Sequence, residues 1–259
     1  MKDATHISVC GLCQLKRWWF SWTESWCEKW HLTINNEKSQ VVHFRKKRKA
    51  RTSYPVKIGP MAIETVGKYR YLGVTLDENL DFKVSAQELA EAGGRALGGL
   101  ISKFKTHKNI GYHTFTKLFN QGITPITDYC NGIWGLKHSS FAEKVQLRAA
   151  RYFMGVNAKT PTHVLTGDMG WKTAKQRMFE NILKYYNRLI NMDHSRLTYK
   201  VFENDLQNIS NENWSGDLEN VLNQIGMSEN IFTGAEIDIN LAKEKLNTLI
   251  DLEWQESVA

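Results

Sequence analysis

Alternation of apolar and polar positions marks the first third of the chain. Residues 31–34 alternate in this way, residues 40–44 are rich in β-branched and aromatic residues, and the two spans predict short strands joined by a turn at Asn35 and Asn36. Val56 and Ile58 precede a glycine-proline pair at residues 59–60, and this pattern predicts a hairpin. A short helix ending near residue 29 is expected before the first strand. The region therefore reads as a small, strand-rich unit.

The segment from Lys68 to Asp77, KYRYLGVTLD, has the clearest period of two. Its apolar residues fall on alternate positions, so it predicts one strand with an apolar face. Gly73 lies on the opposite face, where a glycine lets another backbone approach closely. Asp81 follows and is a good N-cap for a helix.

After residue 81 the apolar positions recur every three or four residues, which is typical of amphipathic helices. The spacing predicts a helix over Tyr112 to Gly122, a later helix that Gly155 ends, and a long helix after Trp171. The first helix of this region carries four glycines that predict close packing against a neighbouring helix: Gly93, Gly94, Gly98 and Gly99.

Charge divides the chain unevenly. The net charge is +7, but residues 201–259 carry 2 Lys and Arg against 12 Asp and Glu, so residues 1–200 are strongly basic. A basic body favours a polyanionic partner such as nucleic acid. No apolar run is long enough to cross a membrane, and no signal peptide is visible. Four cysteines suggest a reducing compartment, so we expect the nucleus or cytoplasm.

Two stretches carry a family resemblance. KYRYLGVTLD, with the upstream WCEKWHLTINNEKSQVVHF, resembles the end of the palm of a non-LTR retrotransposon reverse transcriptase, in which the YLG hairpin is the primer grip. KVQLRAARYFMGVNAKTPTHVLTGDMGW resembles the helical region that follows the thumb. The resemblance implies an α+β fold with a small antiparallel palm remnant and a mostly α-helical thumb and post-thumb region.

The expected organisation has four parts. Residues 1–23 are a Trp-rich segment without a match, residues 24–80 are the palm end, residues 81–205 are the helical region, and residues 206–259 are an acidic helical tail.

The resemblance does not extend to catalysis. Templated nucleotide addition needs carboxylates that converge on two magnesium ions, and in this family two of them are adjacent aspartates. The sequence contains no Asp-Asp pair, so we predict no catalytic or metal-binding residue and assign Mg²⁺ only to the intact family enzyme. We expect the C-terminal part of an RNA-directed DNA polymerase that at most binds primer-template.

The expected partner is an RNA template or an RNA-DNA hybrid, bound with little sequence preference. The candidate contacts include a basic run that could grip a phosphate backbone, serve as a nuclear localisation signal or simply be solvated. The resemblance adds a lysine near the incoming nucleotide and the primer grip. These residues are Arg45, Lys46, Lys47, Arg48, Lys49 and Arg51 for the run, Lys38 for the lysine, and Tyr71, Leu72 and Gly73 for the grip.

Alternatives remain open. The chain could be a domesticated nucleic-acid-binding or scaffold protein. It could also be a zinc-stabilised interaction module, because Cys10, Cys13, Cys27 and His31 have the spacing of a structural zinc site. Finally, the acidic cluster of Asp77, Glu78 and Asp81 reads better as a turn and helix cap than as a metal site.

Overall fold

The computed structural model describes residues 25–35, 38–51, 55–58, 61–106, 110–210 and 213–258. The chain divides into two compact units, Met1–Ser85 and Ala86–Ala259, which we describe separately. Strands occur in the first unit, and the second consists of helices and their connections within the described residues. This confirms the predicted α+β class with a mostly helical remainder. The part boundaries expected at residues 23, 80 and 205 remain predictions.

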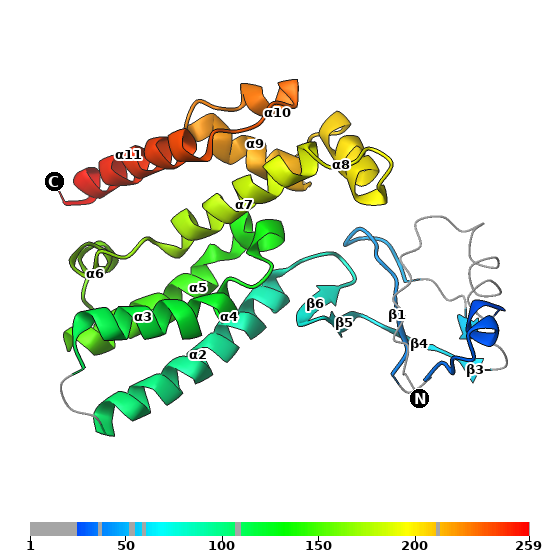
Figure 1. The fold of residues 1–259 in the computed structure, drawn as a ribbon, viewed down its shortest axis with the longest axis horizontal. Coiled ribbons are helices and arrows are strands. Elements are labelled where there is room, and N and C mark those ends of the chain that lie inside the picture. Colours follow the sequence, from blue (N-terminus) through cyan, green and yellow to red (C-terminus); the bar gives the residue numbers. More distant parts are fainter. Residues whose placement is uncertain are drawn as a thin grey trace. The chain divides into compact units, whose positions relative to one another are not determined.

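The strands of the first unit are short and paired two by two (Figure 1). β2 (Lys57–Ile58) and β3 (Met61–Ala62) are antiparallel, which confirms the hairpin predicted around residues 59–60. β1 (Gln40–Val42) pairs with β4 (Glu64–Val66) in parallel, with Gln40 opposite Glu64. The long connection between these two strands brings the chain back in the same direction, as a parallel pair requires. The strand expected at residues 31–34 is absent except for one isolated bridge at Ile34.

The segment Lys68 to Asp77 is a hairpin rather than one continuous strand. β5 (Lys68–Tyr71) pairs with β6 (Val74–Asp77), and Tyr71 lies opposite Val74. Leu72 and Gly73 form the two-residue turn, with φ of 48° and 87°. Two positive φ values in a two-residue loop are the geometry of a type I′ turn, which matches the twist of the strands. The expected place of Gly73 inside a strand is therefore wrong, because its positive φ makes the turn.

The first unit has a small core. Its buried apolar side chains include Cys27, Val42, Val56 and Ile63. After β6 in the sequence, α2 (Lys83–Thr106) begins, and the carboxylate of Asp81 accepts a hydrogen bond of 3.1 Å from the backbone N–H of Lys83. The predicted helix cap is thereby confirmed.

The second unit is built from α2 and nine further described helices. Their bounds are α3 (Tyr112–Gly122), α4 (Thr124–Thr127), α5 (Asn131–Met154), α6 (Thr162–Met169), α7 (Ala174–Ile190), α8 (Leu197–Gln207), α9 (Trp214–Gln224), α10 (Glu229–Thr233) and α11 (Ile239–Val258). α3 has the predicted bounds, and α5 ends at Gly155 with φ of 66°, the left-handed conformation that a terminating glycine adopts.

An aromatic cluster joins α3 to the neighbouring helices. Trp171 stacks on Phe119 at a ring-centre distance of 4.6 Å, and Phe115 stacks on Phe153 of α5 at 4.9 Å. The indole N–H of Trp171 donates to the hydroxyl of Thr116 at 3.2 Å. Stacked and edge-on aromatic pairs contribute beyond their buried area, so this cluster fixes α3 against α5.

The four glycines of α2 differ in how closely other atoms approach them. A Cβ added to Gly93 would lie 2.5 Å from Cγ2 of Thr127, so the predicted close helix approach is correct there. A Cβ on Gly98 or Gly99 would meet nothing within 4 Å, so the prediction is wrong for these two glycines. Gly94 faces the guanidinium of Arg148 rather than the backbone of another helix.

A polar network surrounds the start of α7. The guanidinium of Arg177 donates to the carboxylate of Asp128 at 3.0 Å, to the carbonyl of Lys172 at 3.0 Å and to the side-chain oxygen of Gln146. Nearby, Oε2 of Glu143 accepts from the backbone N–H of Ala174, and burial raises the pKa of this carboxyl group. Its other oxygen is buried with no hydrogen-bond partner among the described residues.

The C-terminal helices are attached to α7 by specific hydrogen bonds (Figure 1). The side-chain amide of Asn187 donates to the carbonyl of Ile237 at 2.8 Å and accepts from its N–H at 3.0 Å. The hydroxyl of the fully buried Tyr186 donates to the carbonyl of Asn230 at 3.1 Å. The acidic segment thus packs on the same helix that forms the core of the second unit.

Candidate nucleic-acid interface

Both ends of the basic run, residues 45–51, contact Glu78, the residue that directly follows the β5–β6 hairpin. The backbone N–H of Arg45 donates to the carbonyl of Glu78 at 2.8 Å, and the Arg45 guanidinium pairs with the Glu78 carboxylate at 2.8 Å. Arg51, at the other end of the run, binds the same carboxylate through Nε at 2.6 Å and Nη2 at 3.1 Å. One carboxylate therefore holds both ends of the loop.

These contacts change the proton affinity of the groups involved. The hydrogen bond from Arg51 is the main cause that lowers the pKa of Glu78, and Arg45 lowers it further against the opposing effect of desolvation. The same contact raises the pKa of Arg51. Glu78 therefore stays ionised to lower pH than an ordinary glutamate, and the loop keeps its closure in mildly acidic solution.

The interior of the loop is shaped by backbone contacts. The N–H of Lys49 donates to the carbonyl of Lys46 at 2.9 Å, and the Arg45 guanidinium also donates to the carbonyl of Lys49. Asn79 donates from its side-chain amide to the carbonyl of Arg45 at 3.0 Å. The loop is thus a defined turn and not simply a charged stretch.

Arg45 and Arg51 share the single carboxylate of Glu78, which balances only one of their two charges. Besides Arg45 and Arg51, Lys47 pairs with Asp81 at 3.1 Å, although its side chain remains 72% exposed. The side chains of Arg48 and Lys49 are exposed and form no ion pair within the described part of the chain. These two cations are therefore available to an outside anion.

The turn of the hairpin is the second predicted contact. Tyr71 is 40% exposed and Leu72 is 74% exposed, so a large apolar side chain lies at the tip of the hairpin. The four-residue strand β6 separates this tip from Glu78 by roughly 16 Å. The tip and the basic loop thus occupy opposite ends of one hairpin and do not form a single cluster.

Lys38 lies beside the same hairpin. Its carbonyl accepts a hydrogen bond of 3.3 Å from the hydroxyl of Tyr69 on β5, and its N–H donates to the side chain of Asn35 at 3.1 Å. The structure therefore attaches all three groups of candidate residues to β5–β6 through different positions.

No group of residues suited to a metal ion occurs within the described ranges. Two members of the proposed zinc set, Cys10 and Cys13, lie outside those ranges, so this alternative stays a prediction. Cys27 is buried and unpaired with another cysteine in the described part of the chain. Among the described helices, none has both the length and the apolar character to span a membrane.

The sequence reading missed the partners of the basic run. Glu78 was placed in a turn, and its pairing with arginines 27 and 33 positions earlier has no local signal. The one signal in the sequence is the acidic cluster of Asp77, Glu78 and Asp81 in an otherwise basic region. This cluster predicts a helix cap, and in the structure Glu78 and Asp81 also pair with cations of the basic run.

Comparisons with known proteins support a transposon origin. No protein-family model and no solved structure match the chain significantly. Two curated proteins of Drosophila melanogaster do. One, described as a probable RNA-directed DNA polymerase from transposon X-element, is 25% identical over 167 residues, which are 63% of this chain and 18% of that protein. The other, from transposon BS, is 21% identical over 169 residues, again 18% of its length.

The chain is therefore related to transposon RNA-directed DNA polymerases, and the predicted resemblance to retrotransposon reverse transcriptases is confirmed. It spans about one fifth of the length of these curated relatives.

Proposed function

We propose that this chain binds nucleic acid through the first unit, with Arg48 and Lys49 contacting phosphates. The observation that carries the proposal is the closure of the loop by Glu78, which pairs with both Arg45 and Arg51, while Arg48 and Lys49 are exposed on a defined turn and form no ion pair within the described residues. A fixed loop loses less conformational freedom on binding than a mobile one. Contacts to phosphates supply affinity with little sequence preference. The similarity to RNA-directed DNA polymerases favours an RNA template or an RNA-DNA hybrid as the partner.

The same proposal includes the hairpin tip. Its exposed Leu72 and the neighbouring turn glycine correspond to the family's primer grip, so the tip would hold the primer end. Because the tip and the loop are roughly 16 Å apart along the hairpin, the two would contact different nucleotides of one bound duplex.

The chain corresponds, in this proposal, to the C-terminal part of an RNA-directed DNA polymerase and has no polymerase activity alone. The support is the absence of an Asp-Asp pair from the sequence, since this chemistry needs carboxylates around two magnesium ions. Primer extension with the purified chain and Mg²⁺ should give no product.

The test of binding is a salt series with a labelled RNA-DNA hybrid. The variant Arg48→Ala/Lys49→Ala should weaken binding and reduce the slope of log affinity against log salt by about two. The control Arg188→Ala/Lys200→Ala removes two exposed charges from helices of the second unit and should leave the slope nearly unchanged. Equal slopes for both pairs would refute the assignment to the loop.

A further inference from the structure

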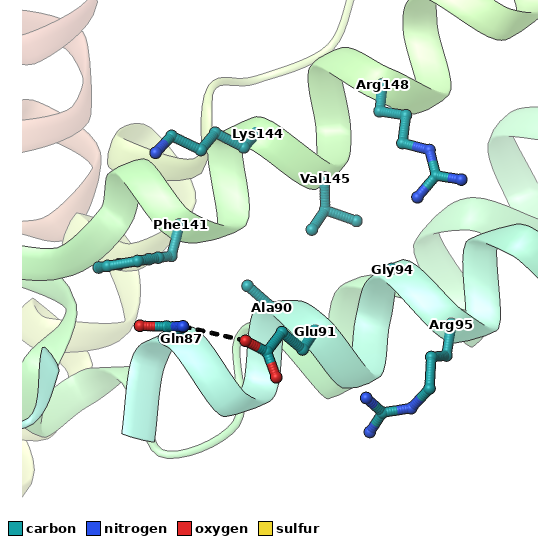
Figure 2. A pocket seen from close by; sticks show the side chains of 9 residues that line it. All are labelled: Gln87, Ala90, Glu91, Gly94, Arg95, Phe141, Lys144, Val145 and Arg148. Atoms are coloured by element: carbon teal, nitrogen blue, oxygen red, sulfur yellow. Dashed lines mark hydrogen bonds between the residues drawn. The ribbon is translucent and has the colours of Figure 1, made fainter. Parts of the chain in front are cut away.

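A groove of about 510 Å³ lies between α2 and α5 in the second unit (Figure 2). Its volume falls in the range of small-ligand sites. The lining residues are Gln87, Ala90, Glu91, Gly94, Arg95, Phe141, Lys144, Val145 and Arg148. No residue of the basic loop takes part, so the groove is a feature separate from the interface proposed above.

The charge of the groove is strongly one-sided. Arg95, Lys144 and Arg148 line it, against the single carboxylate of Glu91, which accepts a hydrogen bond of 3.0 Å from Gln87. Neither arginine forms an ion pair or side-chain hydrogen bond within the described part of the chain. Such unpaired cations beside an apolar floor favour an anionic occupant.

The two ends of the groove differ in chemistry. The guanidinium of Arg148 lies across from Gly94, with Nη1 3.9 Å from the position of a Cβ there, whereas the side chain of Arg95, the next residue on α2, points away from Arg148 (Figure 2). At the other end are Gln87 and the half-buried ring of Phe141, with Lys144 Nζ 5.5 Å from the ring centre (Figure 2). Seven or eight helical residues separate the ends, a distance of about 10–12 Å.

We propose that this groove binds single-stranded polynucleotide, with one phosphate at Arg148, a second at Arg95 and an unpaired base against Phe141. An aromatic ring beside a positively charged track is the usual arrangement for single strands, because every base has a face that can stack. In a duplex the bases are stacked and paired inside, so only the phosphate contact would be available. The groove therefore prefers single strands.

The test measures the affinity of the full chain for labelled oligo-dT and for the RNA-DNA hybrid over a salt series. Arg95→Ala/Arg148→Ala should lower the oligo-dT salt slope by about 1.4, as expected for two phosphate contacts on a single strand. Phe141→Leu keeps an apolar side chain but removes the ring, and should weaken oligo-dT about tenfold. Glu91→Gln should tighten oligo-dT binding, because it removes the one negative charge and keeps the contact to Gln87.

The control pair Arg188→Ala/Lys200→Ala removes the same charge elsewhere on the second unit. A loss of oligo-dT affinity no larger in the arginine variant than in this control would overturn the proposal. So would an unchanged affinity of Phe141→Leu, or an equal loss for oligo-dT and hybrid, since both would indicate a general polyanion surface.

The loop variant Arg48→Ala/Lys49→Ala separates this inference from the proposed function. If only the loop variant changes hybrid binding while the groove variants leave oligo-dT unaffected, the proposed function stands and the groove assignment fails. If only the groove variants act, on oligo-dT, the groove assignment stands without the loop.

Discussion

Two glycines of α2 allow a sharp test of how this helix packs. Gly99 is exposed, and a Cβ there would meet nothing within 4 Å, so Gly99→Ala should add only helix propensity. Replacing a helix-interior glycine by alanine is worth about 1 kcal/mol. For a unit of this size that raises the melting temperature by about 2–4 °C.

The same substitution at Gly93 should have the opposite sign. The new Cβ would lie 2.5 Å from the Cγ2 of Thr127. Thr127 is buried, and its hydroxyl lies 3.1 Å from the carbonyl oxygen of Thr124 and 3.0 Å from a carboxylate oxygen of Asp128, so its side chain cannot rotate away without losing these contacts. Overpacking of this kind costs about 1–3 kcal/mol, which equals or exceeds the gain in propensity.

A second substitution isolates the methyl contact. Thr127→Ser removes Cγ2 and keeps the hydroxyl, so it should destabilise the natural protein by about 1 kcal/mol but stabilise Gly93→Ala. The measurement is urea unfolding of the four proteins of this double-mutant cycle, followed by circular dichroism. If Gly93→Ala is as stable as Gly99→Ala, or if the two changes at 93 and 127 are additive, the close approach inferred for Gly93 is incorrect.

Three further predictions concern other parts of the fold. Leu72→Asn places a residue that tolerates positive φ at the hairpin turn and should stabilise the β5–β6 hairpin by about 1 kcal/mol, seen as slower amide exchange of its strands. Burial raises the pKa of Glu143 in the folded state, so the fold favours its protonated form. The stability that this group contributes is therefore lost as the pH rises from the ordinary pKa of a glutamate through the raised pKa. Glu143→Gln should therefore increase the melting temperature more at pH 8 than at pH 4. Arg177→Ala leaves Asp128 without its guanidinium and should cost about 3 kcal/mol in urea unfolding, with Arg177→Lys recovering only part of it.

Local signals in the sequence were enough for several helices. The bounds of α3 and the end of α5 at Gly155 follow from apolar spacing and from a glycine that can adopt the left-handed conformation. The capping of α2 by Asp81 was equally readable, because the carboxylate and the N–H it accepts from are two residues apart. In these cases the physical cause lies within a few residues.

The hairpin turn at Leu72 and Gly73 was implied by the family resemblance but not by the local apolar pattern, and the contacts of the site had no local signal. Leucine rarely adopts a positive φ, so the alternation of apolar and polar residues through Leu72 predicts a continuous strand where the structure has a type I′ turn. The closure of the basic loop joins Arg45 to Glu78, and the groove joins Arg95 to Arg148, across long sequence separations. Only the tertiary fold decides which charges are neutralised by a partner and which remain available.

The attachment of the acidic helices to α7 has a consequence for any shortened form of this protein. A chain cut near residue 205 would lose the partners of Tyr186 and Asn187, and it would expose the apolar side of α7 that those helices cover. The Tyr186 hydroxyl and the Asn187 side-chain amide would then lack partners beside newly exposed apolar surface, and such a surface promotes aggregation. A shortened form of this protein, whether engineered or produced by proteolysis, therefore needs α9 to α11 together with α7 to stay folded and soluble.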